Sequence, residues 1–295
     1  MKAVRKFNIV PYMFIAPHVL LFIVFFLIPT VLGIYAAFTS WNIFSPPTWV
    51  GFDNFRTILF NSESTFHRQF WNGFRNTITF VIITVPFQIA IPLTIACLLH
   101  TKPVGRNAFQ AIFYVPTLLS ITSVTLTFIF IFNRSLGLWN NILGVDVNWF
   151  GQQPWAWMSI VITTLWWGIG ANMLIYIAAL GGVDQGVLEA ASVDGSAGFH
   201  RFRTIVLPSI RMPLLFTVVA SVVAQFNIFG QPLLLTGGGP SESTHVLLMY
   251  IRNLAFGMGN PIAGLASAMA VCLGLVIGVV SLVQMIAIKK ISEEE

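Results

Sequence analysis

The chain has 295 residues, of which 56% are hydrophobic and only 8% are charged. Soluble domains carry about 25% charged residues, so this composition excludes an ordinary soluble enzyme. We attribute the net charge of +5 mainly to membrane topology, because the basic residues flank apolar stretches. No nucleic-acid partner is predicted from it.

Six stretches of the sequence are long and apolar enough to cross a membrane as helices. A helical span needs about 20 mostly apolar residues, because the hydrocarbon has no water to satisfy backbone groups. None of the stretches contains Asp, Glu, Lys or Arg. In chain order they are 12–38, 78–99, 109–132, 155–180, 213–235 and 262–288. We therefore predict an all-α integral membrane protein with six transmembrane helices.

The first stretch follows a basic N-terminal segment, as the core of a secretory signal does. Its apolar length is about twice that of a signal core, so we predict an uncleaved first span. Pro17 and Pro29 are expected to kink or shorten its helix.

Basic residues indicate which side of the membrane each loop faces. Ten of the 15 Lys and Arg residues lie in the segments 1–11, 100–108, 181–212 and 289–295. Short loops rich in Lys and Arg stay cytoplasmic, so both termini are expected in the cytoplasm. The whole chain, 1–295, is then one membrane domain with external loops 39–77, 133–154 and 236–261.

Small and sulfur-containing residues inside the spans bear on packing. Cys97 and Cys272 both lie in predicted spans, which favours buried packing over a disulfide. The last span carries Gly264 and the spacing Gly274 to Gly278, and small residues let helices approach closely in lipid. Such spacings also arise by chance in apolar segments, so a specific packing role stays open.

The long internal segment 181–212 is predicted to form two short helices. Asp184 can cap the first helix, and Gly195 can supply the left-handed residue that ends it. The second helix is expected near 199–206, with Pro208 restricting its continuation.

Two roles for this segment follow from its composition. Small Ala190 and Ala191 allow close approach to another surface, which implies a protein partner. Alternatively, the helices lie on the membrane, where Arg201 and Arg203 suit anionic lipid headgroups.

The pattern Glu189-Ala190-Ala191, then Asp194-Gly195, then Ile205 and Leu207-Pro208 resembles the EAA loop of ABC importer permeases. The resemblance implies the type I ABC importer permease architecture. It also implies that the first short helix is a coupling helix that docks in a cleft of a cytoplasmic ATPase. The implied coupling residues are Glu189, Ala190, Ala191, Asp194, Gly195, Leu207 and Pro208. In the alternative interpretation, Glu189 is only a solvated loop carboxylate, whose exposed ion pair contributes about 0 to 1 kcal/mol.

External segments are similar to those of the carbohydrate subgroup, which includes maltose-type and glycerol-phosphate-type permeases. These segments are 49–55, 236–256 and the adjoining 266–268. The resemblance implies an importer with a second permease subunit, giving a heterodimer, two cytoplasmic ABC ATPase subunits and an external substrate-binding protein. It places the chain, surrounded by lipid, in a bacterial or archaeal cytoplasmic (inner) membrane.

The chain lacks an energy source of its own. No G-x-x-x-x-G-K-[ST] phosphate loop occurs, and no Asp, Glu, Lys or Arg lies in a predicted span to couple ions. His18 lies in the first span, where packing or an interface role is favoured over proton relay. We therefore expect a transport subunit that is not an enzyme and holds no cofactor, with ATP and Mg bound by the partner ATPases.

The absence of charge in the spans favours a neutral polyhydroxyl cargo, because a charged solute in a low-dielectric passage needs countercharges or strong dipoles. Sugar sites combine aromatic faces with amides and hydroxyls. Ser221 and Gln225 share a helix face that Ile228 continues. By resemblance to maltose-type permeases, the substrate-passage positions are Trp167, Gly168, Ala171, Ser221, Gln225 and Ile228.

Alternatives remain at the level of single residues and of the whole protein. Each polar residue in a span also suits an interhelical hydrogen bond or an interfacial anchor. Glycerol phosphate or another small polar nutrient is an alternative cargo. An ion-coupled secondary transporter would show relay residues or inverted repeats. A membrane enzyme would need clustered ligating or catalytic side chains, and the five histidines are scattered.

Overall fold

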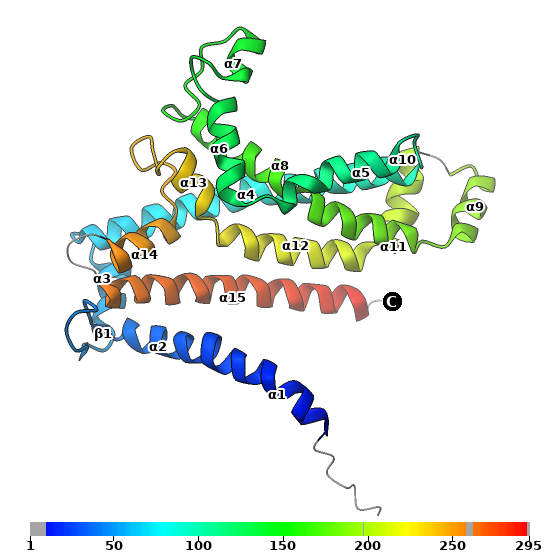
Figure 1. The fold of residues 1–295 in the computed structure, drawn as a ribbon. Helices are drawn as coiled ribbons and strands as arrows, with labels where there is room; N and C mark the ends of the chain where they lie inside the picture. The colour runs from blue at the N-terminus through cyan, green and yellow to red at the C-terminus, as the bar shows by residue number, and fades with distance from the viewer. Residues whose placement is uncertain (1–9, 197, 258–261, 294–295) are drawn as a thin grey trace, which may run out of the picture. The chain divides into compact units, whose positions relative to one another are not determined.

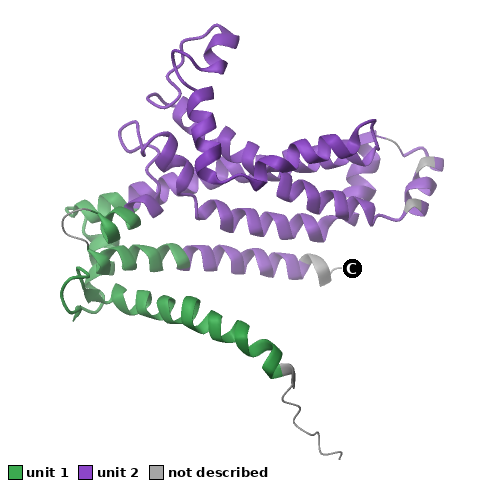
Figure 2. Ribbon diagram, viewed as in Figure 1, with its two compact units in different colours: residues 1–70, 251–274 green, residues 71–250, 275–295 purple. Residues whose placement is uncertain are grey.

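The computed structural model describes residues 10–196, 198–257 and 262–293, and helices dominate this part of the chain (Figure 1). The chain divides into two compact units. One contains residues 1–70 and 251–274, and the other contains residues 71–250 and 275–295 (Figure 2). Helices α4 (Thr65–His100), α14 (Leu247–Phe256) and α15 (Ala263–Glu293) each contribute to both units.

Four helical stretches among the described residues are long and apolar enough to span a membrane, or six if each of two bent helix pairs counts as one span. The four are Tyr12–Ala37, Thr65–His100, Trp155–Gly181 and Ala263–Lys290. Three of them, Tyr12–Ala37, Trp155–Gly181 and Ala263–Lys290, agree closely with the first, fourth and sixth predicted stretches. The second helix begins at Thr65, well before the expected residue 78.

The third predicted stretch is not one helix, so the expectation of a continuous helix over 109–132 is wrong. It consists of α5 (Arg106–Tyr114), the 3-10 turn η2 (Val115–Leu118) and α6 (Ile121–Ile131), bent by 105°. Pro116 removes a backbone donor at this point. Ser120 then starts α6 by accepting the Ser123 N–H at 3.2 Å.

The fifth predicted stretch is also interrupted. Helix α12 (Arg211–Phe226) is capped by Asn227, and the short α13 (Gly230–Leu235) follows after Phe229, whose φ of −151° and ψ of −55° are not helical. A continuous helix would need an N–H at residue 232 to bond residue 228, and Pro232 has none. The expected continuous helix over 213–235 is therefore wrong.

Two of the prolines that lie within helical segments are preceded by a π turn. The π turn η1 (Ile23–Leu27) separates α1 (Val10–Phe22) from α2 (Ile28–Ala37) and precedes Pro29. In the same way, η3 (Phe202–Val206) separates α10 (Gly198–Arg201) from α11 (Leu207–Ser209) and precedes Pro208. A π turn shifts the hydrogen-bond pattern by one residue, which accommodates the missing proline donor.

The hydroxyl after each proline completes this arrangement. Thr30 Oγ1 donates to the Phe26 carbonyl at 2.6 Å, and Ser209 Oγ donates to the Ile205 carbonyl at 2.7 Å. The helical segment ends at Ser209, one residue past Pro208 and three residues beyond the expected end at residue 206, and it does not continue straight into α12. The chain instead bends by 75° between the helical segment Gly198–Ser209 and α12.

The unit formed by residues 1–70 and 251–274 contains the two strands of the described chain. Strands β1 (Thr39–Ser40) and β2 (Thr48–Trp49) pair antiparallel, with Thr39 opposite Trp49. Helix α3 (Asp53–Phe60) follows, and Asn54 Nδ2 donates to the carbonyls of Ala37 and Thr39 at 2.9 Å each. One buried amide thus ties the end of α2 to α3.

Gly264, near the start of α15, lies close to the backbone of strand β1 in the same unit. A Cβ there would overlap the Thr39 carbonyl, and the Gly264 N–H donates to the Trp41 carbonyl at 3.2 Å. The packing role of Gly264 is thereby confirmed. A Cβ at Gly274 or Gly278 would have no such neighbour within 4 Å among the described residues, so no close approach explains either glycine there.

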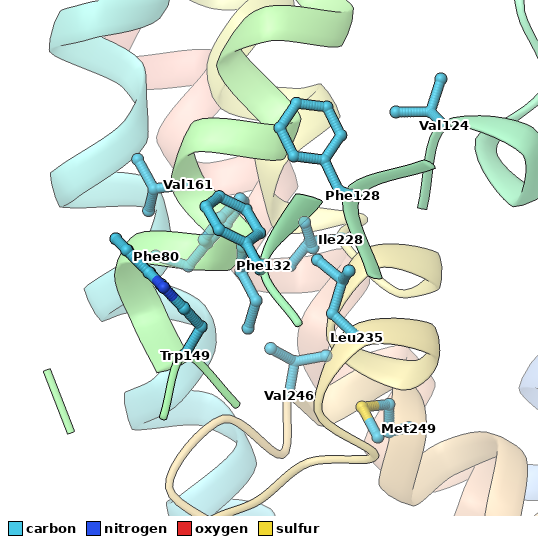
Figure 3. Packing of buried hydrophobic residues seen from close by; sticks show 11 residues of the cluster. Phe80, Val124, Phe128, Phe132, Trp149, Val161, Ile228, Leu235, Val246 and Met249 are labelled. Atoms are coloured by element: carbon cyan, nitrogen blue, oxygen red, sulfur yellow. The ribbon is translucent and has the colours of Figure 1, made fainter. Parts of the chain in front are cut away.

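The unit formed by residues 71–250 and 275–295 is built around α8 (Trp155–Gly181), which packs against α5, α12 and α13 (Figure 1). An apolar cluster fills its interior and includes Trp149, which lies against Phe132 with ring centroids 4.7 Å apart. Its members are Phe80, Val124, Phe128, Phe132, Trp149, Ile160, Val161, Ile228, Leu235, Val246 and Met249 (Figure 3). The cluster joins α4, α6, α8 and α13, and Trp149 follows the short helix α7 (Leu138–Leu143).

The segment 236–246 is held against α4 by side-chain amides. Asn76 Nδ2 donates to the carbonyls of Glu242 and His245 at 2.9 and 3.0 Å. The His245 ring stacks on Tyr250 with centroids 4.0 Å apart. Its Nε2 atom is buried and has no hydrogen-bond partner among the described residues. Burial lowers the pKa of His245 below its ordinary value of 6.5, and the Glu242 carboxylate opposes this shift.

We expect acid to destabilise this segment through His245. Because the folded pKa lies below the unfolded one, the contribution of the neutral imidazole is complete above about pH 6.5 and is lost as the pH falls toward the folded pKa. His245→Phe keeps a ring on Tyr250 without a titratable nitrogen. The unfolding temperature of wild type should fall more between pH 7.5 and 5.5 than that of His245→Phe. Equal falls would contradict this assignment.

Candidate functional site

A cavity of about 450 Å³ lies in the unit formed by residues 71–250 and 275–295. It is lined by α4, α8 and α12, and by the ends of α6 and α13 where the third and fifth predicted stretches are broken. All six positions predicted for the substrate passage line it: Trp167, Gly168, Ala171, Ser221, Gln225 and Ile228. The structure thus brings these residues together from α8, α12 and the turn that follows α12.

Asn172 joins the three helices that form the cavity wall. Its Nδ2 atom donates to the Gln88 carbonyl of α4 at 3.0 Å and to Ser221 Oγ of α12 at 3.2 Å. In a regular helix the Gln88 carbonyl would accept the N–H of residue 92, but Pro92 has none. Asn172 therefore supplies the donor that Pro92 removes, and it is 9% exposed.

A second amide contact crosses from α4 to α12. Gln225 Nε2 donates to Gln88 Oε1 at 3.4 Å, and both side chains are buried. The Gln88 Nε2 atom lies so close to Gly168 of α8 that an added Cβ would overlap it. Gly168 therefore provides the space that the Gln88 amide occupies.

Trp167 is held at the break between α5 and α6. Its indole Nε1 donates to the Leu119 carbonyl at 3.0 Å, and Thr117 Oγ1 donates to the Trp167 carbonyl at 3.0 Å. The break leaves the Leu119 carbonyl and the Thr117 hydroxyl available to α8. An interruption that the sequence analysis did not predict therefore holds Trp167, which it did predict as a cavity residue.

Tyr176 and Trp166, two further polar or aromatic residues of α8, do not line this cavity. Tyr176 is fully buried, and its hydroxyl forms a hydrogen bond with Thr217 Oγ1 of α12 at 2.5 Å. Tyr176 thus makes an interhelical hydrogen bond, which was the alternative to a role in the substrate passage. Trp166 packs edge-on against Phe128 with centroids 5.4 Å apart.

The cavity wall is uncharged, and side-chain amides stand among its apolar residues. None of the described residues that line it is Asp, Glu, Lys, Arg or His. Amides are contributed by Gln88, Asn172, Gln225, Asn227 and Gln231. Such groups both donate and accept hydrogen bonds, so the wall suits a ligand that carries hydroxyls.

Gln88 was missed by the sequence analysis. The resemblance directed attention to the fourth and fifth stretches, and Gln88 lies in the second. A signal was present, since Gln88 is an isolated amide in an apolar stretch between Pro86 and Pro92. Which cavity it faces depends on contacts with residues distant in the sequence.

The internal segment folds locally as predicted at its caps. Helix α9 (Gln185–Val193) starts where Asp184 Oδ1 accepts the Gly186 N–H at 2.7 Å. Gly195 has φ +76° and ends the helix in the left-handed conformation. The Ser196 N–H then bonds the Ala191 carbonyl at 2.8 Å.

The predicted coupling residues occupy two helices. In α9 and the turn after it, Glu189, Ala190 and Asp194 are exposed, whereas Ala191 is buried. Leu207 and Pro208 lie in α11, half-buried and exposed respectively.

Glu189 lines a second cavity, of about 330 Å³, at the C-terminal ends of α4 and α8. The cavity also includes His100 of α4, Leu180 of α8 and Arg201 of α10. Leu207 and Pro208 are outside it. The structure therefore brings Glu189 to the ends of two helices that also line the larger cavity.

We predict that Asn172 and Pro92 are energetically coupled. Asn172→Ala should leave the buried Gln88 carbonyl without a donor, at a cost of roughly 1–3 kcal/mol. Pro92→Ala restores an N–H at that point. The double variant should therefore unfold at a higher temperature than Asn172→Ala alone, as measured by thermal unfolding of the purified protein in detergent. Strictly additive losses would show that the two residues act independently.

The chain is similar in sequence to known proteins over most of its length. Residues 89–293 match the family described as "Binding-protein-dependent transport system inner membrane component". The chain is 30% identical to the probable ABC transporter permease protein YesP of Bacillus subtilis (strain 168), over 96% of this chain and 91% of that protein. It is also 30% identical to the probable starch degradation products transport system permease protein AmyD of Thermoanaerobacterium thermosulfurigenes, over 95% and 94%.

A solved structure shares the fold over almost the whole chain. It is a crystal structure of a bacterial ABC transporter involved in the import of the acidic polysaccharide alginate, and it superposes with a TM-score of 0.83 at 24% identity, covering 96% of each chain. The sequence matches extend over most of the chain, including α8, α9 and α12. The chain therefore belongs to the family of inner membrane components of binding-protein-dependent transport systems.

Proposed function

We propose that this chain is the transmembrane permease subunit of an ATP-driven ABC importer that translocates a neutral sugar or oligosaccharide. The observation that carries this proposal is the uncharged, amide-lined cavity between α4, α8 and α12. Its volume of about 450 Å³ falls in the range of roughly 300–1,000 Å³ that is usual for small-molecule sites.

The chemistry of the wall matches a polyhydroxyl ligand. Amide groups exchange hydrogen bonds with hydroxyls in both directions, and an aromatic ring covers the C–H face of a sugar. Gln88, Asn172 and Gln225 provide the amides, and Trp167 provides the ring. A phosphate or carboxylate would instead favour fixed cationic side chains, because burying an unpaired charge is costly.

The relatives support a carbohydrate cargo. AmyD is named for starch degradation products, and the transporter of known structure imports the acidic polysaccharide alginate. The same fold therefore serves an acidic polysaccharide elsewhere, so the charge of the cargo must be argued from the wall itself. Here the wall favours a neutral sugar over glycerol phosphate.

We further propose that α9 is the coupling helix. Its exposed Glu189 would pair with a basic residue in the cleft of a cytoplasmic ATPase, with Ala190 permitting close packing. The complete importer would contain a second permease, two ATPase subunits that bind ATP and Mg, and an external binding protein. Both termini of this chain would lie in the cytoplasm, and the chain would reside in the bacterial or archaeal inner membrane.

Helix α8 offers a physical link between ATPase docking and the cavity. It carries Gly168 and Asn172 in the large cavity and Leu180 in the cavity beside Glu189. At 1.5 Å per residue the separation from Gly168 to Leu180 is roughly 18 Å. A helix transmits displacement over this distance, so movement of α9 on ATP binding would reach the passage through α8.

The test is purification of the chain with the products of its neighbouring genes, followed by ATPase assays with binding protein loaded from a panel. The panel contains maltotriose, lactose, an alginate trisaccharide and glycerol 3-phosphate. We expect an ATPase to co-purify and a neutral sugar to stimulate it. A stable chain without an ATPase would overturn the importer assignment, and stimulation only by the anionic compounds would overturn the neutral cargo.

We predict that Glu189→Lys abolishes uptake while the protein still inserts in the membrane, because the reversed charge would repel a basic cleft. Glu63→Lys is the matched control, since Glu63 is an exposed carboxylate in the turn before α4. Uptake into cells at matched expression is the measurement. Normal uptake by Glu189→Lys would remove Glu189 from the docking surface.

A further inference from the structure

Gln88 is fixed by its backbone and held weakly by its side chain. Its carbonyl accepts the Asn172 amide at 3.0 Å, which anchors this part of α4 to α8. Its side-chain oxygen accepts the Gln225 amide at 3.4 Å, longer than the roughly 2.7–3.2 Å of usual N–H···O bonds. The anchored backbone keeps the residue at the cavity, and the long side-chain contact is easily exchanged.

One hydrogen bond joins the two amides at the cavity wall. Gln88 is 8% exposed and Gln225 is 7% exposed, and buried polar groups require partners. A ligand hydroxyl that enters between them can accept from one amide and donate to the other, because a hydroxyl does both. The exchange leaves no amide unpaired.

Gly168 determines where the Gln88 amide can lie. Any Cβ at position 168 would overlap Gln88 Nε2. Since glycine has no side chain to offer a ligand, its place in the cavity wall is explained by the amide that packs on it.

We infer that Gln88 is a specificity-determining residue of the passage. Its side-chain amide gives up its hydrogen bond with Gln225 and bonds a hydroxyl of the transported sugar instead. This inference rests on the proposed sugar import. A site arranged to bond a hydroxyl discriminates against the analogue that lacks it, because the site's polar groups are then left unpaired. The contact therefore selects for one particular hydroxyl.

The experiment uses the complete importer in proteoliposomes with its binding protein. The substrates are whichever neutral sugar of the panel the wild type imports, maltotriose or lactose, and its monodeoxy derivatives, one for each hydroxyl. Each variant is compared with wild type using the same binding protein, so discrimination by that protein cancels. Uptake rates relative to the parent sugar are measured for wild type, Gln88→Ala, Gly168→Ala and the control Thr94→Val, an exposed position on the same helix.

For one deoxy position, wild type should import the derivative roughly threefold to tenfold more slowly than the parent, the range expected for loss of one hydrogen bond. Gln88→Ala should lose this difference at that position only. Gly168→Ala, which displaces the amide without removing it, should lose it too. Thr94→Val should retain the wild-type pattern.

A structural role for Gln88 would give a different result. If both variants reduce uptake of the parent and all derivatives by the same factor, or leave every discrimination ratio unchanged, the inference is overturned while sugar import stands. If wild type imports no neutral sugar, the proposed function itself fails. Because Gly168→Ala retains the amide, it tests the inference even if Gln88→Ala does not assemble.

Discussion

The backbone of a membrane helix must satisfy its own polar groups, and each proline in an apolar stretch of this chain removes a donor from that arrangement. In lipid no water replaces the lost donor. The structure meets this constraint in different ways. The side chain of Asn172 supplies a donor opposite Pro92. At Pro29 and Pro208 a π turn precedes the proline and a hydroxyl follows it. At Pro116 the helix breaks.

These proline sites also account for the shape of the cavity. The breaks after η2 and α12 bring Ile121 and Gln231 to its wall, beside residues of α8 and α12. The bond that compensates Pro92 anchors α4 to α8, which places Gln88 between Gly168 and Gln225. Polar groups that satisfy the backbone therefore lie next to polar groups that line the cavity, and Asn172 belongs to both sets.

An importer must hold its passage residues firmly and still allow them to change partners. The two kinds of contact in this cavity differ in length in a way that suits both needs. Asn172 bonds a backbone carbonyl at 3.0 Å, whereas the amides of Gln225 and Gln88 meet at 3.4 Å. Helix α8 extends from this cavity to the end beside α9. The arrangement gives the proposed coupling helix a rigid connection to a wall whose side chains can be exchanged.

The sequence by itself determined those features that depend on neighbouring residues. Apolar length located the long helices, because burial of a span in lipid is a property of about 20 consecutive residues. Asp184 and Gly195 marked the ends of α9, because a cap bonds groups within one turn. The cavity residues on α8 and α12 were also found, with the help of a family resemblance.

Only the tertiary structure decided which stretches break and which amide completes the cavity. Prolines were visible in the sequence, but Pro92 leaves α4 continuous whereas Pro116 accompanies a bend of 105°. At Pro92 a replacement donor reaches the freed Gln88 carbonyl, and that donor lies 84 residues away on another helix. Contacts between residues so distant have no local signature, which is why Gln88 emerged only from the folded chain.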